Sequence, residues 1–148
     1  MALASTYSAA VEGVTAHFVT VEANVGPGLP GIHIVGLGDK AVGESRDRIR
    51  TAVANSVLPW PRTKIMVSLS PANLPKSGSH FDLPIALAVL ASMDPRAERK
   101  LKRSLIVGEL ALSGELRRVD GILQIILEAL HSDIEHVIIP ASNAREAA

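Results

Sequence analysis

The chain of 148 residues contains no cysteine. Disulfide bonds, thiolate metal sites and cysteine nucleophiles are therefore excluded, and the composition fits a cytosolic protein. Aromatic residues make up only 3% of the chain, which argues against a stacking platform for single-stranded nucleic acid. The core must instead be built mainly from Val, Ile, Leu and Ala, since 47% of the residues are hydrophobic. Such a core suits an α/β protein.

An excess of charge of either sign and a long apolar run are also missing. Lysine plus arginine and aspartate plus glutamate each number 15, so no overall field directs the chain to nucleic acid or to a membrane. The first residues, MALASTYSAAVEG, have neither the basic start nor the apolar run of a signal peptide. No apolar segment approaches the roughly 20 residues of a membrane helix. We therefore expect one soluble, cytoplasmic domain without a membrane partner.

Alternating apolar residues predict three strands in the first part of the chain. Residues 3–11 form a weak pattern that we assign to an edge strand, and residues 15–25 alternate clearly. The breaker-rich turn GPGLPG at 26–31 leads into a short strand at 32–35. The second and third strands are therefore predicted to be antiparallel neighbours.

A first amphipathic helix is predicted up to Asn55, with Asp39 as its N-cap. Its apolar stripe includes Ile49, and its charged residues cover the opposite face. Glu44 and Arg48 are spaced as an i,i+4 ion pair, which stabilises a helix by about 0.2–0.5 kcal/mol.

The central stretch, residues 68–93, reads as the end of a strand, a loop and an apolar helix. Residues 64–69 alternate as a half-buried strand. Asp82 is placed to cap the helix, and Pro84 is tolerated in its first turn. The helix is apolar as far as Met93, so we expect it to be buried on most sides.

The remaining chain alternates again between strands and helices. Residues 96–103 form a charged, partly helical connector, residues 105–112 a strand, and residues 116–119 a return strand after a tight turn. Asp120 is predicted to cap a second amphipathic helix. The run HVII at 136–139 has the form of a buried strand.

The glycines at positions 36, 38 and 43 follow a strand and precede a helix, as in a phosphate-binding loop. The chain has no GxxxxGK[ST] sequence, however, and this spacing is not GxGxxG. A plain strand-to-helix turn is the favoured interpretation, with nucleotide binding as the alternative. The five histidines show no HxH or HExxH spacing, so no metal site is expected.

A local basic bias runs through Arg46, Arg48 and Arg50 towards Arg62 and Lys64. A solvated helix face explains it most simply. The alternative is contact with phosphate or with another subunit, because arginine suits bidentate contacts.

The loop PKSGSHFD at residues 75–82 is the main candidate for catalysis. Nucleophilic catalysis needs a serine beside a base, and Ser79 adjoins His80, with Lys76 as another base. Neighbouring residues in a loop usually point apart, so the favoured alternative is that this loop only builds a turn and a helix cap.

Four blocks of sequence resemble a known family. They are GLPGIHIVGLGDKAVGESRDRIRTAVANS, VSLSPANLPKSGSHFDLPIALAVLA, VGELALSGELRRVDGIL and VIIPASNAREA. In this order they are similar to the N-terminal domain of the Mg-chelatase-like AAA+ proteins, the YifB/ComM family. Gly38 departs from the family pattern, where proline is common, and affects only a turn.

The resemblance implies an α+β (two-layer α/β) fold, with a mixed β-sheet and helices packed mainly on one face. This fold is similar to the Lon protease domain and belongs to the ribosomal S5 domain 2-like class. Laid on residues 75–82, the Lon nucleophile falls at His80, and the lysine of the Lon dyad falls at Leu123. The resemblance therefore implies a Lon-like scaffold without Lon chemistry, and no catalytic, cofactor or metal residues.

The resemblance also implies a role. Residues 1–148 would be a single non-catalytic accessory domain of a longer AAA+ ATPase of ComM type, serving DNA branch migration. The ATPase module, with ATP and Mg²⁺, would lie outside this chain, and the whole protein would form a homo-hexamer. Contacts with DNA or a subunit are expected at Arg46, Arg48, Arg50 and Lys76. The alternatives are a serine peptidase using Ser79, and an interaction domain without DNA binding.

Overall fold

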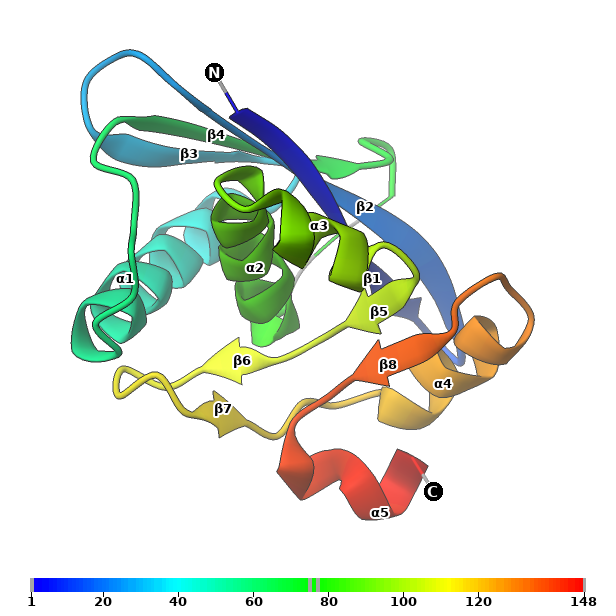
Figure 1. Ribbon diagram of the computed structural model, residues 1–148. Coiled ribbons are helices and arrows are strands. Elements are labelled where there is room, and N and C mark those ends of the chain that lie inside the picture. Colours follow the sequence, from blue (N-terminus) through cyan, green and yellow to red (C-terminus); the bar gives the residue numbers. More distant parts are fainter. Residues whose placement is uncertain (1, 75, 77, 148) are drawn as a thin grey trace.

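A mixed six-stranded sheet forms the centre of the computed structural model, which describes residues 2–74, 76 and 78–147 (Figure 1). Its strands are β1 (Ala2–Glu12), β2 (Thr15–Gly26), β3 (Gly31–Val35), β4 (Lys64–Ser70), β5 (Ser104–Ile106) and β8 (His136–Ile138). They lie in the order β3-β4-β2-β1-β5-β8. β2 is antiparallel to β1 and to β4, and the other neighbours are parallel. Strands β6 (Glu109–Leu110) and β7 (Leu116–Arg117) form a separate hairpin.

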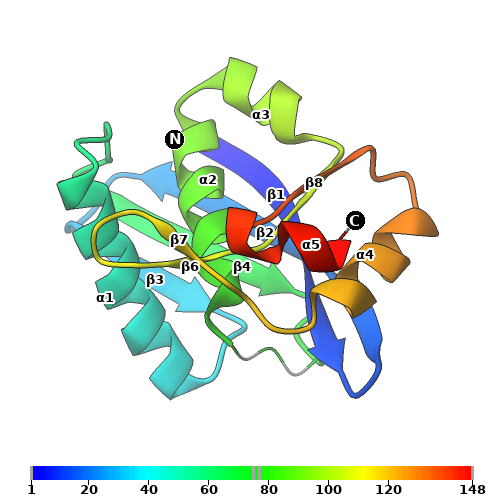
Figure 2. The same ribbon diagram turned by 90° about the horizontal axis from the view of Figure 1, so that it is seen from below.

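The main helices pack on one face of this sheet, which confirms the predicted fold class. The helices are α1 (Asp39–Asn55), α2 (Asp82–Ser92), α3 (Pro95–Leu101), α4 (Ile122–Leu130) and α5 (Ala144–Ala147), with 3₁₀ turns η1 (Ser79–Phe81) and η2 (Ala141–Asn143). Figure 2 shows α1 beside β3 at one end of the molecule and α4 beside the β1–β2 hairpin at the other.

Successive residues of β1 and β2 point to opposite faces, and this alternation builds two apolar cores. Ala10 and Val19 belong to the core under α1 and α2. Ala9 and Phe18 belong to the smaller core under α4. Each fully buried Val, Leu, Ile or Phe side chain stabilises the fold by about 1.5–3 kcal/mol. The central hairpin is therefore covered on both faces, with α4 and α5 as the exceptions to the one-sided arrangement.

The structure corrects the predicted strand order. β1 does not lie at an edge, because it pairs with β2 on one side and with β5 on the other. β2 and β3 are not neighbours either, since β4 lies between them. The chain passes from β3 through α1 to β4, and such a crossover makes these two strands parallel. The turn at 26–31 therefore spans two strand positions.

The predicted strand at 105–112 is divided into β5 and β6, which belong to different sheets. The division lies at Gly108, whose N–H donates to the His80 carbonyl at 2.9 Å and whose carbonyl accepts from the Leu83 N–H at 3.0 Å. These two bonds tie the segment to the start of α2 rather than to a strand, so the ladder ends at Ile106.

Three predicted helix caps are wrong. The N-cap positions of α1, α2 and α4 are Gly38, Phe81 and Gly121, and none makes a side-chain cap bond. Asp39 and Asp82 lie one residue inside their helices, and Asp120 lies before Gly121. At the start of α3, by contrast, an aspartate does act as N-cap, because the Asp94 carboxylate accepts from the Arg96 N–H at 3.0 Å.

The predicted pair of Glu44 with Arg48 does not form. Arg48 turns towards Asp82, with 2.6 Å between its Nε and the carboxylate, and Glu44 lies 3.9 Å from Lys40 Nζ. A buried carboxylate attracts the guanidinium more strongly than a solvated one, because water screens the exposed pair.

Candidate functional site

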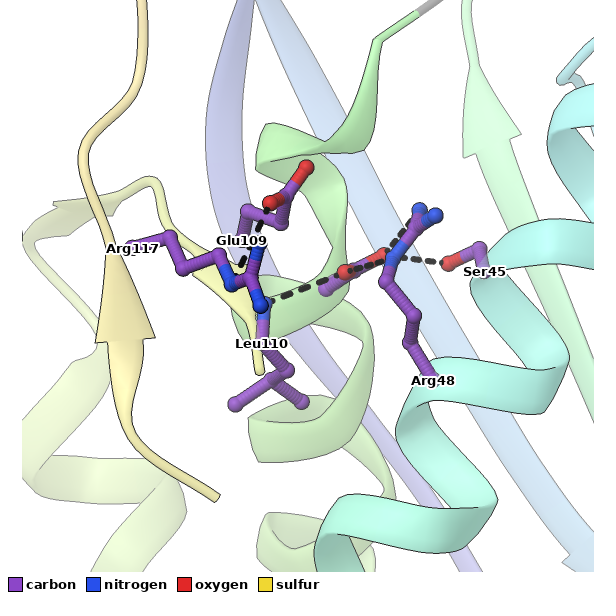
Figure 3. A network of polar contacts seen from close by, with 6 residues as sticks. Ser45, Arg48, Glu109, Leu110 and Arg117 are labelled. Atoms are coloured by element: carbon purple, nitrogen blue, oxygen red, sulfur yellow. Dashed lines mark hydrogen bonds and ion pairs between the residues drawn. The ribbon is translucent and has the colours of Figure 1, made fainter. Parts of the chain in front are cut away.

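A buried carboxylate, Asp82, joins three parts of the fold (Figure 3). From α1, Ser45 Oγ donates to Oδ1 at 2.6 Å. Arg48 donates from Nε to Oδ2 at 2.6 Å and from Nη2 to Oδ1 at 3.1 Å. From β6, the Leu110 N–H donates to Oδ2 at 3.1 Å. Four donors thus satisfy both oxygens of a side chain that has no exposed surface.

The charges of this network compensate one another. The hydrogen bonds that Arg48 donates to Asp82 raise the pKa of Arg48 above its ordinary value, although partial burial acts in the opposite direction. Glu109, on β6, adds a weaker favourable charge, and Arg117 of β7 lies 3.9 Å from it. The Arg48 side chain is only 22% exposed, so its bidentate contact with Asp82 is largely shielded from water. The network therefore holds α1, α2 and β6 together as a structural clamp.

Lys76 is directed into its own loop. It is 5% exposed, and its Nζ donates to the carbonyls of Pro71 and Leu74, the latter at 2.9 Å. Desolvation lowers the pKa of Lys76. The neighbouring loop residues Pro75 and Ser77 lie outside the described residues.

His80 is half-buried in η1 and contacts the central hairpin. Its Nε2 lies 2.8 Å from the Ala9 carbonyl, so Nε2 carries the proton that this bond needs. Burial lowers the pKa of His80 and outweighs the Ala9 bond and the Asp82 charge, which act in the other direction. Within the part of the chain that the structure describes, no hydrogen bond joins the Ser79 side chain to His80 or Lys76. The imidazole and the ammonium groups are both bonded to backbone carbonyls.

The three arginines of α1 occupy different environments. Arg48 points inward to Asp82, Arg46 is half-exposed, and Arg50 is exposed. Arg50 shares two surface hollows with Trp60 and Arg62 of the loop that follows α1. The prediction that all three arginines lie on one solvated helix face is wrong for Arg48, whose acidic partner was missed. The signal available was an isolated Asp82 between apolar residues, where a charge needs a partner.

Gly36, in the turn before α1, serves packing. A Cβ on Gly36, whose φ is +103°, would lie 2.5 Å from the Leu69 carbonyl oxygen. Only glycine allows this approach of β4. This glycine therefore has a structural explanation within a strand-to-helix turn, the favoured interpretation.

Residues 2–74, 76 and 78–147 contain neither a metal-binding cluster nor a membrane-spanning helix. No three His, Asp or Glu side chains there are grouped so that they could hold a metal ion. Among the same residues, no helix has the length and apolar character needed to cross a membrane.

The fold and the four sequence blocks belong to a defined class of protein. Residues 21–143 match the family described as subunit ChlI of Mg-chelatase, and the chain belongs to this family. It is 46% identical over 147 residues to competence protein ComM of Haemophilus influenzae, and 42% identical over 146 residues to the uncharacterised protein YifB of Escherichia coli. An uncharacterised protein of Mycobacterium tuberculosis is 44% identical over 147 residues.

These alignments cover 99% of this chain but only 29% of each relative. The chain thus spans less than a third of the length of the curated relatives it matches. The resemblance to the YifB/ComM proteins is confirmed.

Proposed function

We propose that this chain is a non-catalytic, N-terminal accessory domain of a cytoplasmic Mg-chelatase-like AAA+ ATPase, in which it serves ring assembly and DNA processing. The relative named competence protein ComM supports a role in handling DNA. The remaining length of such a protein supplies the ATPase module, which binds ATP and Mg²⁺, and the whole assembles as a homo-hexamer. The Lon-like scaffold without the Lon dyad is part of the same proposal.

The observation that carries the assembly role is a leucine stripe on the outer face of α4. Leu123, Leu127 and Leu130 are 54%, 48% and 72% exposed. Their i, i+4, i+7 spacing places them on one side of the helix, away from the buried Ile122 and Ile125. A helix that is apolar on both faces needs a second partner, because contiguous exposed apolar surface marks an interaction site.

The rest of the parent protein is what packs against the leucine stripe. The chain accounts for 29% of the length of its relatives, so most of such a protein remains to be packed. α5, the last helix, lies beside α4 in both views (Figures 1 and 2), and Ala147 packs against the core under α4. α5 thus covers the buried side of α4 and leaves the exposed leucine stripe to another part of the protein.

Assembly can be tested by replacing Leu123 and Leu127 with glutamate in the full-length protein. We expect sedimentation to show loss of the hexamer, while the same changes leave the circular dichroism of the 148-residue chain intact. Leu112→Glu is the matched control, because Leu112 is equally exposed (54%) but lies outside α4. A hexamer that persists in the double variant would contradict the assembly role.

DNA contact is the second part of the proposal, and it falls to Arg46 and Arg50. Arg48 and Lys76, the other two expected contacts, already donate to Asp82 and to backbone carbonyls.

Two results would favour the alternative functions. Peptide cleavage by this chain that Ser79→Ala abolishes would overturn the non-catalytic assignment. DNA binding by the full-length protein that is unchanged when this domain is removed would favour the interaction domain without DNA contact.

A further inference from the structure

Positive charge is concentrated in the middle of this neutral chain. Between Asp47 and Asp82 there is no aspartate or glutamate. The same segment carries five cationic residues: Arg48, Arg50, Arg62, Lys64 and Lys76. The segment covers the second half of α1, the loop that follows it, β4 and the loop before α2. This segment of the sequence is therefore cationic although the overall charge of the chain is zero.

Three of these cations remain without an internal partner. Arg50, Arg62 and Lys64 are exposed, and none forms an ion pair with another described residue. They lie at the corner where the α1–β4 loop passes the β2–β3 turn, opposite the end of the molecule that carries α4 (Figures 1 and 2). This corner can accept negative charge from outside.

The only tryptophan of the chain lies among these cations. Trp60, which is partly buried against the core, lines two hollows of about 510 and 560 Å³. Arg50 and Arg62 line both hollows as well, and the remaining walls are largely apolar. Trp60, Arg50 and Arg62 thus line the same hollows, and an aromatic ring and a guanidinium group can each stack on a nucleic-acid base.

The loop that presents Trp60 contains an unusual backbone conformation. Val57 has φ +53°, which is rare for a β-branched residue. Its side chain is 89% exposed, so burial of that side chain does not offset the cost. A strained residue of this kind costs about 1–3 kcal/mol and often occurs at binding sites. Val57 lines one of the two hollows together with Trp60, so the strained residue lies beside the tryptophan.

We propose that Arg50, Trp60 and Arg62 form a binding site for single-stranded nucleic acid. One base stacks on Trp60, and the two arginines neutralise the phosphates on either side of it. One tryptophan supplies one stacking position, which is compatible with a chain too poor in aromatics to stack a row of bases. A duplex fits less well, because its bases are already stacked on each other. This inference rests on the DNA contact of the proposed function and assigns its place and its strand type.

Trp60 itself provides the measurement, since it is the only tryptophan. A single-stranded thymidine oligonucleotide titrated into the protein at low salt is expected to quench its fluorescence. Arg50→Gln with Arg62→Gln should weaken binding at least about tenfold at low salt and flatten its dependence on salt concentration. Trp60→Leu, read by anisotropy of a labelled oligonucleotide, should weaken binding by about tenfold. Arg99→Gln is the matched control, because Arg99 is exposed on α3, outside both hollows.

The outcomes separate this site from the wider proposal. Binding that survives the double arginine change would overturn the site and leave DNA contact through other residues standing. A preference for duplex over single strand at equal salt would also overturn it. Absence of binding to either form, in the full-length protein as well, would overturn the site and the DNA contact together. Because the arginines are exposed, the double variant tests the site even if Trp60→Leu fails to fold.

Discussion

Helices α2 and α4 have similar sequence signals at their starts, but they differ in burial. Each is strongly apolar, and each has an aspartate at or just before its start that predicts an N-cap. Asp82 is fully buried and accepts four hydrogen bonds, whereas Asp120 is exposed. α2 is buried over most of its surface, whereas α4 exposes its leucine stripe. The same sequence signal thus marks an internal anchor in one helix and a solvated turn in the other.

The molecule therefore has a centre whose buried charged groups are bonded internally and two ends that expose apolar or charged side chains. At the centre, α2 lies against the β1–β2 hairpin and is tied to α1 and β6 by the clamp. At the ends, the leucine stripe and the corner around Trp60 present groups without internal partners. The two proposals accordingly place partner contacts at the two ends and none at the centre.

The largest expected change in the free energy of unfolding comes from breaking the ion pair between Asp82 and Arg48. Asp82→Asn removes the charge that partners the partly buried Arg48, and loss of one member of a buried ion pair costs about 3–5 kcal/mol. Urea unfolding followed by circular dichroism measures this loss. Asp120→Asn is the matched control and should change the free energy of unfolding by less than about 0.5 kcal/mol, as for other exposed sites. Equal effects of the two changes would remove the contrast between the helices.

The two faces of α4 provide the next comparison. Ile125→Ala creates a cavity in the core under α4 and should cost about 2–5 kcal/mol. Leu127→Ala removes a half-exposed side chain, so in the 148-residue chain it should cost less than about 1 kcal/mol. The same urea experiment measures both. A large effect of Leu127→Ala in this chain would mean that the stripe is already packed.

The start of α4 depends on a glycine rather than on Asp120. Gly121 has φ +80°, and a Cβ there would lie 2.8 Å from Val11 Cγ2. The left-handed conformation alone costs a residue with a side chain about 1–2 kcal/mol, so we expect Gly121→Ala to lower the free energy of unfolding by at least that amount. Adding Val11→Ala should relieve the steric part, and the double variant should be less unstable than the sum of the single changes. Strict additivity would contradict the contact.

The smallest expected effect is on the pH dependence of stability, and it comes from His80 in the turn that leads into α2. Because the pKa of His80 is lowered by burial, the unfolded chain binds this proton first as pH falls. The stability that neutral His80 contributes is complete above about pH 6.5, the usual unfolded pKa, and is lost as pH falls towards the folded pKa. His80→Gln keeps a donor for the Ala9 carbonyl but does not titrate, so its urea midpoint should fall less between pH 7.5 and pH 5.5. An unchanged fall would assign the pH dependence to other groups.

Much of the fold followed from local patterns. The strands at 15–25 and 64–69, the first helix and the apolar central helix are found as predicted, because period-2 and period-3.6 patterns report which face is buried. Strand order did not follow, since pairing of β1 with β5 joins segments nearly a hundred residues apart. The polar network around Asp82 was not predicted: Arg48 was named as a candidate outward contact, but its internal partner and the place of Trp60 were missed.

The sequence by itself determined the family, the α+β class and the segregation of positive charge between Asp47 and Asp82, since these depend on residue identity and order alone. Only the tertiary structure decided which charges are used internally and which face outward. A carboxylate such as Asp82 forms bonds with whichever donors the packing of other elements brings within reach, and no local pattern encodes that distance. The same packing leaves one face of α4 and the arginines beside Trp60 uncovered.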